Sequence, residues 1–166
     1  MEANNSNNLF NENLSSDEQK PQNLDDMLIA YRQQWTNEIT NLNEMMKSVH
    51  KVDELLTIVY SKRQTLVDYY YGMNSVILKQ TNEYKKLYND MYNNIKLNGY
   101  NGMRIATDQN INRLIESELI ERKNTIDALA NHNSFVKDTI STIDNIIYGI
   151  NQKIKLHCLL NGISNI

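Results

Sequence analysis

The feature that most constrains this chain is an apolar seam near the C-terminus, whose members recur at steps of three and four residues. The seam consists of Ile126, Leu129, Asn133, Val136, Ile140, Ile143, Ile147, Ile150 and Ile154. Alternating steps of three and four place all of these residues on one stripe of an α-helix, as in a coiled coil. Isoleucine dominates the stripe, and in parallel coiled coils Ile at both seam positions favours assemblies larger than dimers. We therefore expect the stripe to be an oligomerisation seam between copies of the chain.

Residues that interrupt helices are scarce, with five Gly and one Pro among 166 residues. Sandwiches, barrels and dinucleotide-binding folds need frequent turns, so this composition argues against them and predicts an all-α fold. We expect long helices in a hairpin or coiled-coil-like arrangement. The single cysteine, Cys158, excludes a disulfide scaffold and a cysteine-based structural zinc site within one chain.

Composition and periodicity divide the chain into a tail and one helical domain. Residues 1–23 are rich in Asn, Ser and Glu and carry little apolar surface, which predicts a disordered acidic tail. The domain then covers residues 24–166. Its expected helices are residues 25–71, ended by Gly72, residues 75–97, and residues 108–161.

The polar stretch from Asn131 to Ser134 leaves two possibilities for the last helix. The heptad phase survives through this stretch, which favours one continuous helix with the polar Asn133 on its seam. The alternative is a break there, giving two shorter packed helices.

Charge is distributed unevenly along the chain. Residues 1–27 contain six acidic residues and one lysine, although the whole chain has a net charge of only −3. Residues 60–104 contain seven basic residues and three acidic ones. A basic middle beside acidic segments suits a polyanionic ligand or head-to-tail self-association.

The sequence lacks the motifs that usually mark an active site. It contains no glycine-rich phosphate loop, nucleophile elbow or zinc motif. We therefore expect a protein that is not an enzyme, with no catalytic residues, metal or cofactor. It also lacks a signal peptide and a long apolar run, so we expect a cytoplasmic protein without membrane contact.

Basic and aromatic residues are interleaved in the middle of the chain, where Ser61–Gly72 carries two cations ahead of three consecutive tyrosines. Lysine and arginine neutralise phosphates, and tyrosine rings stack on unpaired bases. The pattern predicts a surface for single-stranded DNA. Its candidate residues are Lys62, Arg63, Tyr69, Tyr70, Lys79, Lys85 and Lys86. The alternative is that the tyrosines belong to the core and the cations to a solvated helix face.

Three segments resemble the recombination mediators of T4-type phages, the UvsY-like family. The first is Tyr69-Tyr70-Tyr71-Gly72 after a basic segment, in a long helix that follows Trp35. The second is Ile126-Asp127-Ala128-Leu129, and the third runs from Tyr148 through Ile154 to Gly162. The resemblance covers roughly residues 28–162.

This resemblance implies an all-helical protein that forms ring-like homo-oligomers. It also implies binding to single-stranded DNA, displacement of the single-strand binding protein, and loading of the phage recombinase. If the chain is phage-encoded, it would act in the cytoplasm of an infected host cell. A different class of function stays open: a structural coiled-coil oligomer, such as a virion, scaffold or tail-assembly component, in which the basic helix is a salt-bridging surface.

Overall fold

The computed structural model describes residues 23–47 and 52–161, and their secondary structure is helical. The helices are α1 (Leu24–Met45), α2 (Val52–Asn98), α3 (Asp108–Glu118) and α4 (Ile120–Leu160). A lone β-bridge joins Tyr100 to Met103, and the described residues form no strand. The all-α prediction is therefore confirmed. The predicted tail lies outside the described residues except for Asn23, which caps α1 by accepting a hydrogen bond from the backbone N–H of Asp26.

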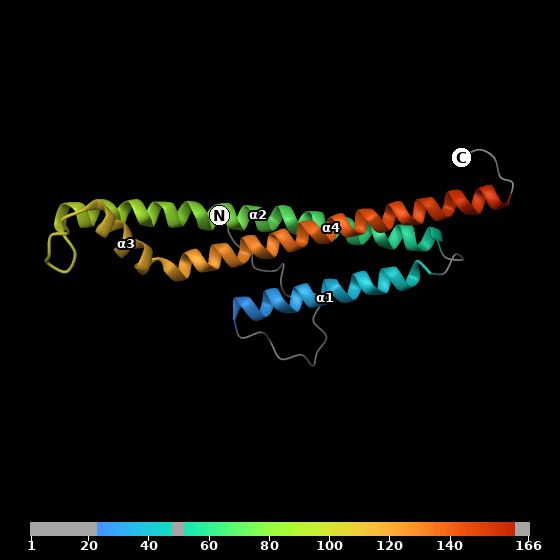
Figure 1. Ribbon diagram of the computed structural model, residues 1–166, viewed down its shortest axis with the longest axis horizontal. Coiled ribbons are helices and arrows are strands. Elements are labelled where there is room, and N and C mark those ends of the chain that lie inside the picture. Colours follow the sequence, from blue (N-terminus) through green and yellow to red (C-terminus); the bar gives the residue numbers. More distant parts are fainter. Residues whose placement is uncertain (1–22, 48–51, 162–166) are drawn as a thin grey trace, which may run out of the picture.

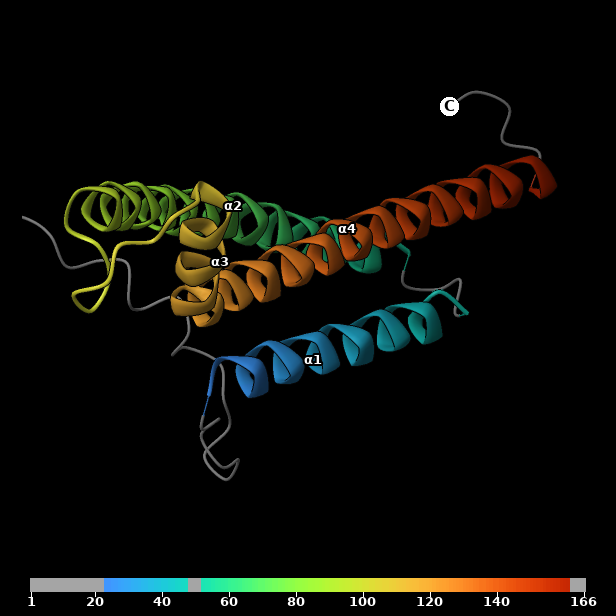
Figure 2. The same cartoon turned by 60° about the vertical axis from the view of Figure 1, so that its left-hand side comes forward.

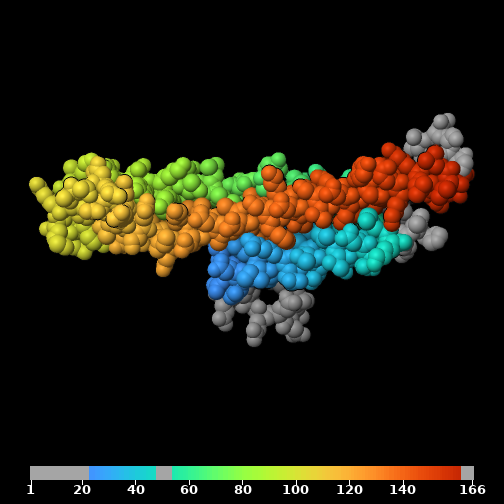
Figure 3. All heavy atoms as spheres, viewed as in Figure 1, coloured from blue at the N-terminus to red at the C-terminus, as the bar shows by residue number. Residues whose placement is uncertain are grey.

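Two long helices form the frame of an elongated molecule (Figures 1 and 2). Helices α2 and α4 lie antiparallel, and α3 crosses between them at one end of the rod. Helix α1 runs antiparallel to α2 beside the middle of this pair, so that the last turns of α4 extend beyond it. The space-filling view shows α1 as a separate layer laid along α4 (Figure 3). With 47 residues, α2 alone is about 70 Å long.

Apolar side chains form three clusters along the rod. The largest joins α1, α2 and α4 around Trp35, Leu66 and Ile143. A small cluster, made by Leu28, Met73 and Leu129, lies near the start of α1. The third lies at the α3 end, where Ile95 of α2 packs against Ile111, Ile115 and Leu119. This last cluster contains no residue of α1, because it is built by the end of α2, the loop that follows, α3 and Leu119.

The residues of the predicted oligomer seam pack against other helices of the same chain. Val136, Ile143 and Ile150 are buried in the largest cluster, and Ile140, Ile147 and Ile154 pack against it. Leu129 and Asn133 are also buried, and Ile126 is half-buried. A coiled-coil stripe needs a helical partner, and α1 and α2 of the same chain supply it. The seam is therefore not a free surface for other copies in this conformation.

The predicted helix over residues 25–71 begins where α1 begins, but it is wrong in its continuity and in its end. Helix α1 ends at Met45, and a turn follows in which the N–H of Lys47 bonds to the carbonyl of Glu44. The apolar spacing of three and four residues runs on past Met45 because both helices face the same core, in which Leu42 of α1 and Leu55 of α2 are buried. At the other limit, α2 passes through Gly72 and absorbs the predicted helix 75–97. Packing of Leu66 and Met73 on either side outweighs the helix cost of one glycine, about 1 kcal/mol.

Gly72 therefore offers a direct test of the continuous helix. A Cβ added there would meet no atom within 4 Å, so Gly72→Ala is expected to raise the free energy of unfolding by about 1 kcal/mol. Chemical denaturation measures this change. As a comparison, Gly99→Ala should destabilise, because Gly99 has a φ of 77° and its Cβ would lie 2.5 Å from the carbonyl oxygen of Met103. A loss of stability in Gly72→Ala would show that the helix bends or ends at this position.

The predicted helix over residues 108–161 is interrupted once, at Leu119. This residue leaves the helical region (φ −101°, ψ 10°) and is buried in the α3 cluster. The turn lets α3 pack against the end of α2 while α4 returns along its length. The polar stretch 131–134 is continuous helix, which decides between the two possibilities above. The residues left between the predicted helices 75–97 and 108–161 include a loop, in which Gly99, Asn101 and Gly102 all have positive φ.

Candidate nucleic-acid interface

Lys62 and Arg63 are adjacent on α2 but point to different neighbours. The Lys62 ammonium lies 2.9 Å from the Glu38 carboxylate of α1. The Arg63 guanidinium donates to the Asp144 carboxylate of α4 at 2.6 Å. Each cation therefore pairs with an acid of a different helix. Partly exposed pairs of this kind contribute about 0.2–1 kcal/mol, so a polyanion could compete for either cation.

Tyr69, predicted to stack on a base, already stacks on another ring. Its ring lies 4.4 Å from that of Tyr31, at an interplanar angle of 16°. Both rings are half-buried between α1, α2 and α4, and burial raises the pKa of Tyr31 to about 12. Burial likewise raises the pKa of Tyr69 well above its ordinary value. Both hydroxyls thus stay protonated at neutral pH.

A buried histidine, His132 of α4, completes this aromatic cluster. Its Nδ1 accepts a hydrogen bond from Arg32 Nε at 3.4 Å, and its Nε2 lies 3.0 Å from the Tyr69 hydroxyl. Because Nδ1 accepts, the neutral ring carries its proton on Nε2 and donates it to Tyr69. Burial, and then the nearby Arg32 charge, lower the pKa of His132 to about 4. A second proton would face a guanidinium in a dry site, which explains the direction of the shift.

The next residue of α4, Asn133, adds a polar contact to the same core layer. Its side-chain amide donates to the Asn74 oxygen at 2.8 Å, while its own oxygen is buried without a hydrogen-bond partner among the described residues. Polar groups at one layer of an otherwise apolar seam can fix the register of the helices. The pair Asn133–Asn74 thus aligns α4 against α2 within the chain.

The three consecutive tyrosines of α2, residues 69–71, differ in how they face solvent. Tyr70 is half-buried against the largest cluster, whereas Tyr71 leaves 65% of its surface exposed. The two rings meet edge to face, with centroids 5.5 Å apart. Tyr71 was not among the predicted site residues, although it is the tyrosine of this run with a free ring face. Helical spacing alone could not show this, because three consecutive residues point in three directions.

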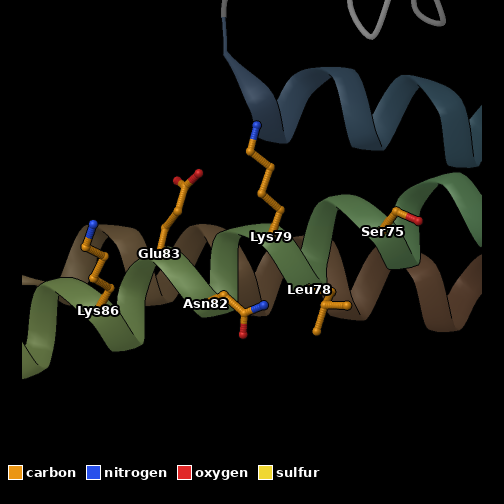
Figure 4. Close-up of a pocket in the computed structure, with 6 residues that line it drawn as sticks. All are labelled: Ser75, Leu78, Lys79, Asn82, Glu83 and Lys86. Carbon is orange, nitrogen blue, oxygen red and sulfur yellow. The ribbon is translucent and has the colours of Figure 1, made fainter.

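Lys79, Lys85 and Lys86 are exposed on α2 beyond the tyrosines. Lys79 and Lys86 border an open surface depression together with Ser75, Leu78, Asn82 and Glu83 (Figure 4). In the close-up, Lys79, Glu83 and Lys86 project from the same side of the helix, and Lys79 extends toward α1. The carboxylate of Glu83 lowers the positive potential of this stretch but leaves it net basic.

We found no match to this chain among protein-family models, curated proteins or solved structures.

The geometry thus separates the seven predicted residues into two groups. Lys79, Lys85 and Lys86 lie exposed on α2, and we call them, with Tyr71, the outer face of α2. The other four, Lys62, Arg63, Tyr69 and Tyr70, are half-buried and contact α1 or α4. Tyr71 and Lys85 are fourteen residues apart, and Lys79 and Lys86 seven, so each pair lies close to one line along the helix. The two lines are separated by roughly 90° around the helix axis, so the outer face is a broad one.

Two further kinds of site are absent from the part of the chain that the structure describes. No group of three or more His, Cys, Asp or Glu side chains there could hold a metal ion. None of the described helices combines the length and the apolar character that a membrane span requires.

Proposed function

We propose that this chain is a non-enzymatic recombination mediator that binds single-stranded DNA and helps to load a recombinase onto DNA coated by single-strand binding protein. The observation that carries the proposal is the outer face of α2, where three lysines accompany an exposed tyrosine on one helix. Cations neutralise phosphates and an exposed ring stacks on a base without reading sequence. The resemblance to UvsY-like mediators supports the same function and supplies the expected protein partners.

One chain offers few cations, and this shapes the expected binding. Weak contacts on one subunit become tight binding when several subunits hold one strand, because later contacts are intramolecular. A ring-like homo-oligomer, as the resemblance implies, would supply that multiplication. Its contacts would have to come from surfaces other than the seam of α4, which α1 and α2 cover.

Replacing Lys79, Lys85 and Lys86 together by Ala is the test of this surface. Each phosphate contact on a single strand contributes about 0.7 to the salt slope, so loss of three should flatten the slope by about 2. Fluorescence anisotropy of a labelled oligo(dT) at several salt concentrations measures it. The matched control replaces Lys123, Lys137 and Lys155, three exposed lysines of α4, and changes the net charge equally. If both triple variants lost the same amount of oligo(dT) affinity and of salt slope, a site on α2 would be contradicted.

A structural coiled-coil oligomer is the second candidate, and one observation favours it. Lys62 and Arg63 tie α2 to α1 and α4 through Glu38 and Asp144, as expected of a salt-bridging surface. Under this function the cations stabilise the rod rather than bind a ligand. Absence of oligo(dT) binding by the unmodified protein at low salt would favour it over a mediator.

A further inference from the structure

Helix α1 contacts two of the predicted DNA-binding residues of α2. The Glu38 carboxylate lies against the Lys62 ammonium, and the Tyr31 ring stacks on Tyr69. Tyr31 and Glu38 are seven residues apart on α1, and Lys62 and Tyr69 are seven apart on α2. Two antiparallel helices in this register bring both pairs together at the same time, about 10 Å apart along the rod.

The chemistry of these two contacts matches that of a nucleotide. A carboxylate is an oxygen anion, as a phosphate is, and both bind a lysine ammonium through charge-assisted hydrogen bonds. A tyrosine ring stacked flat on Tyr69 fills the space that an unpaired base would need. Helix α1 thus places a carboxylate where Lys62 would bind a phosphate, and a ring where Tyr69 would stack on a base.

Displacement of helix α1 would leave the most extensive interface of the bundle, between α2 and α4, in place. Helix α1 has 22 residues and lies beside the middle of the molecule, whereas α2 and α4 contact each other over a longer interface (Figure 1). The cluster at the α3 end contains none of its residues. Buried Leu28, Trp35 and Leu42 hold α1 closed when no ligand is present.

We propose that α1 is an intramolecular competitor of single-stranded nucleic acid, which covers Lys62 and Tyr69 until a strand displaces it. This inference rests on the proposed function and assigns a regulation to it. Binding begins on the outer face of α2 and extends to Lys62 and Tyr69 as α1 moves away. The affinity for a strand therefore depends on how tightly α1 is held.

Glu38→Gln tests the competition in the full-length protein. The variant removes the anion from Lys62, so oligo(dT) should bind about 1.4- to fivefold more tightly, the range expected for loss of one partly exposed pair. Glu44→Gln is the matched control, because it makes the same charge change on α1, and among the described residues its carboxylate pairs with Lys47 of the following turn. The affinity of Glu44→Gln for oligo(dT) should increase less than that of Glu38→Gln.

The single tryptophan reports the movement directly. Trp35 lies on α1 and is 6% exposed, so its emission should shift to the red when oligo(dT) displaces the helix. If the unmodified protein binds with no shift and Glu38→Gln gains no more than Glu44→Gln, the competition is disproved and the proposed function stands. If neither the unmodified protein nor Glu38→Gln binds at low salt, the proposed function itself fails.

Discussion

Replacing Ile143 by Ala is expected to lower the free energy of unfolding by about 2–5 kcal/mol, the range for removing a fully buried isoleucine. Ile143 has no exposed surface and lies in the cluster that joins α1, α2 and α4. The cavity left behind would face rigid helices that cannot close around it. Chemical or thermal denaturation followed by circular dichroism measures the loss.

The control for this prediction is Ser141→Ala on the exposed side of the same helix. It alters α4 without touching the core and should change stability by no more than about 0.5 kcal/mol. A loss below about 1 kcal/mol in Ile143→Ala would contradict the intramolecular packing of the seam. It would point back to a seam whose partner is another copy of the chain.

Acid is expected to destabilise the protein through His132 before most carboxylates titrate. The pKa of His132 is about 4 in the folded protein and ordinarily 6.5. Between these pH values the histidine is protonated in the unfolded chain and neutral in the folded one. The contribution of His132 to the free energy of unfolding is therefore fully present above about pH 6.5. It falls by roughly 2–3 kcal/mol as the pH drops toward about 4. The groups around the ring account for this: Tyr31 and Arg32 of α1, Tyr69 of α2, and Phe135 of α4.

Denaturation at pH values from 4 to 7.5 tests this prediction in paired variants. His132→Asn cannot take up the proton, so the part of the pH dependence due to this site should disappear, whatever the variant's stability at pH 7. His157→Asn, at an exposed position near the end of α4, should keep the full dependence. An unchanged slope in His132→Asn would show that the acid sensitivity has another origin.

The helical fold and the loop after α2 followed from the sequence, but the turn after α1 and the bend at Leu119 did not. Steps of three and four marked every long helix, and the glycine-rich loop after α2 was plain in the sequence. The end of α1 at Met45 and the turn at Leu119 carry no glycine or proline. Tertiary packing sets both changes of direction, because each of them brings two apolar helix faces together. A single sequence does not show which of these faces will pair. For the same reason the seam could be recognised as a helix-pairing surface while its partner could not.

The candidate site was predictable by residue type more than by position. Lysines and tyrosines in the middle of the chain indicated a binding surface, and Lys79, Lys85 and Lys86 are exposed as such a surface requires. The sequence did not reveal that Glu38 and Tyr31 lie on Lys62 and Tyr69, since those contacts join residues 24 and 38 positions apart. Nor did it distinguish Tyr71 from its neighbours, because the direction of each ring depends on where α4 packs.

The length of α2 has a consequence for how the protein behaves in solution. A compact domain of 166 residues has a radius of gyration of about 15 Å, whereas this helix alone extends about 70 Å. A rod experiences more friction than a sphere of the same 19.4 kDa mass, so it diffuses more slowly and elutes earlier from a sizing column. A monomer calibrated against globular standards would therefore look like an oligomer. The number of subunits should therefore be determined by light scattering or sedimentation equilibrium, because these methods measure molar mass independently of shape.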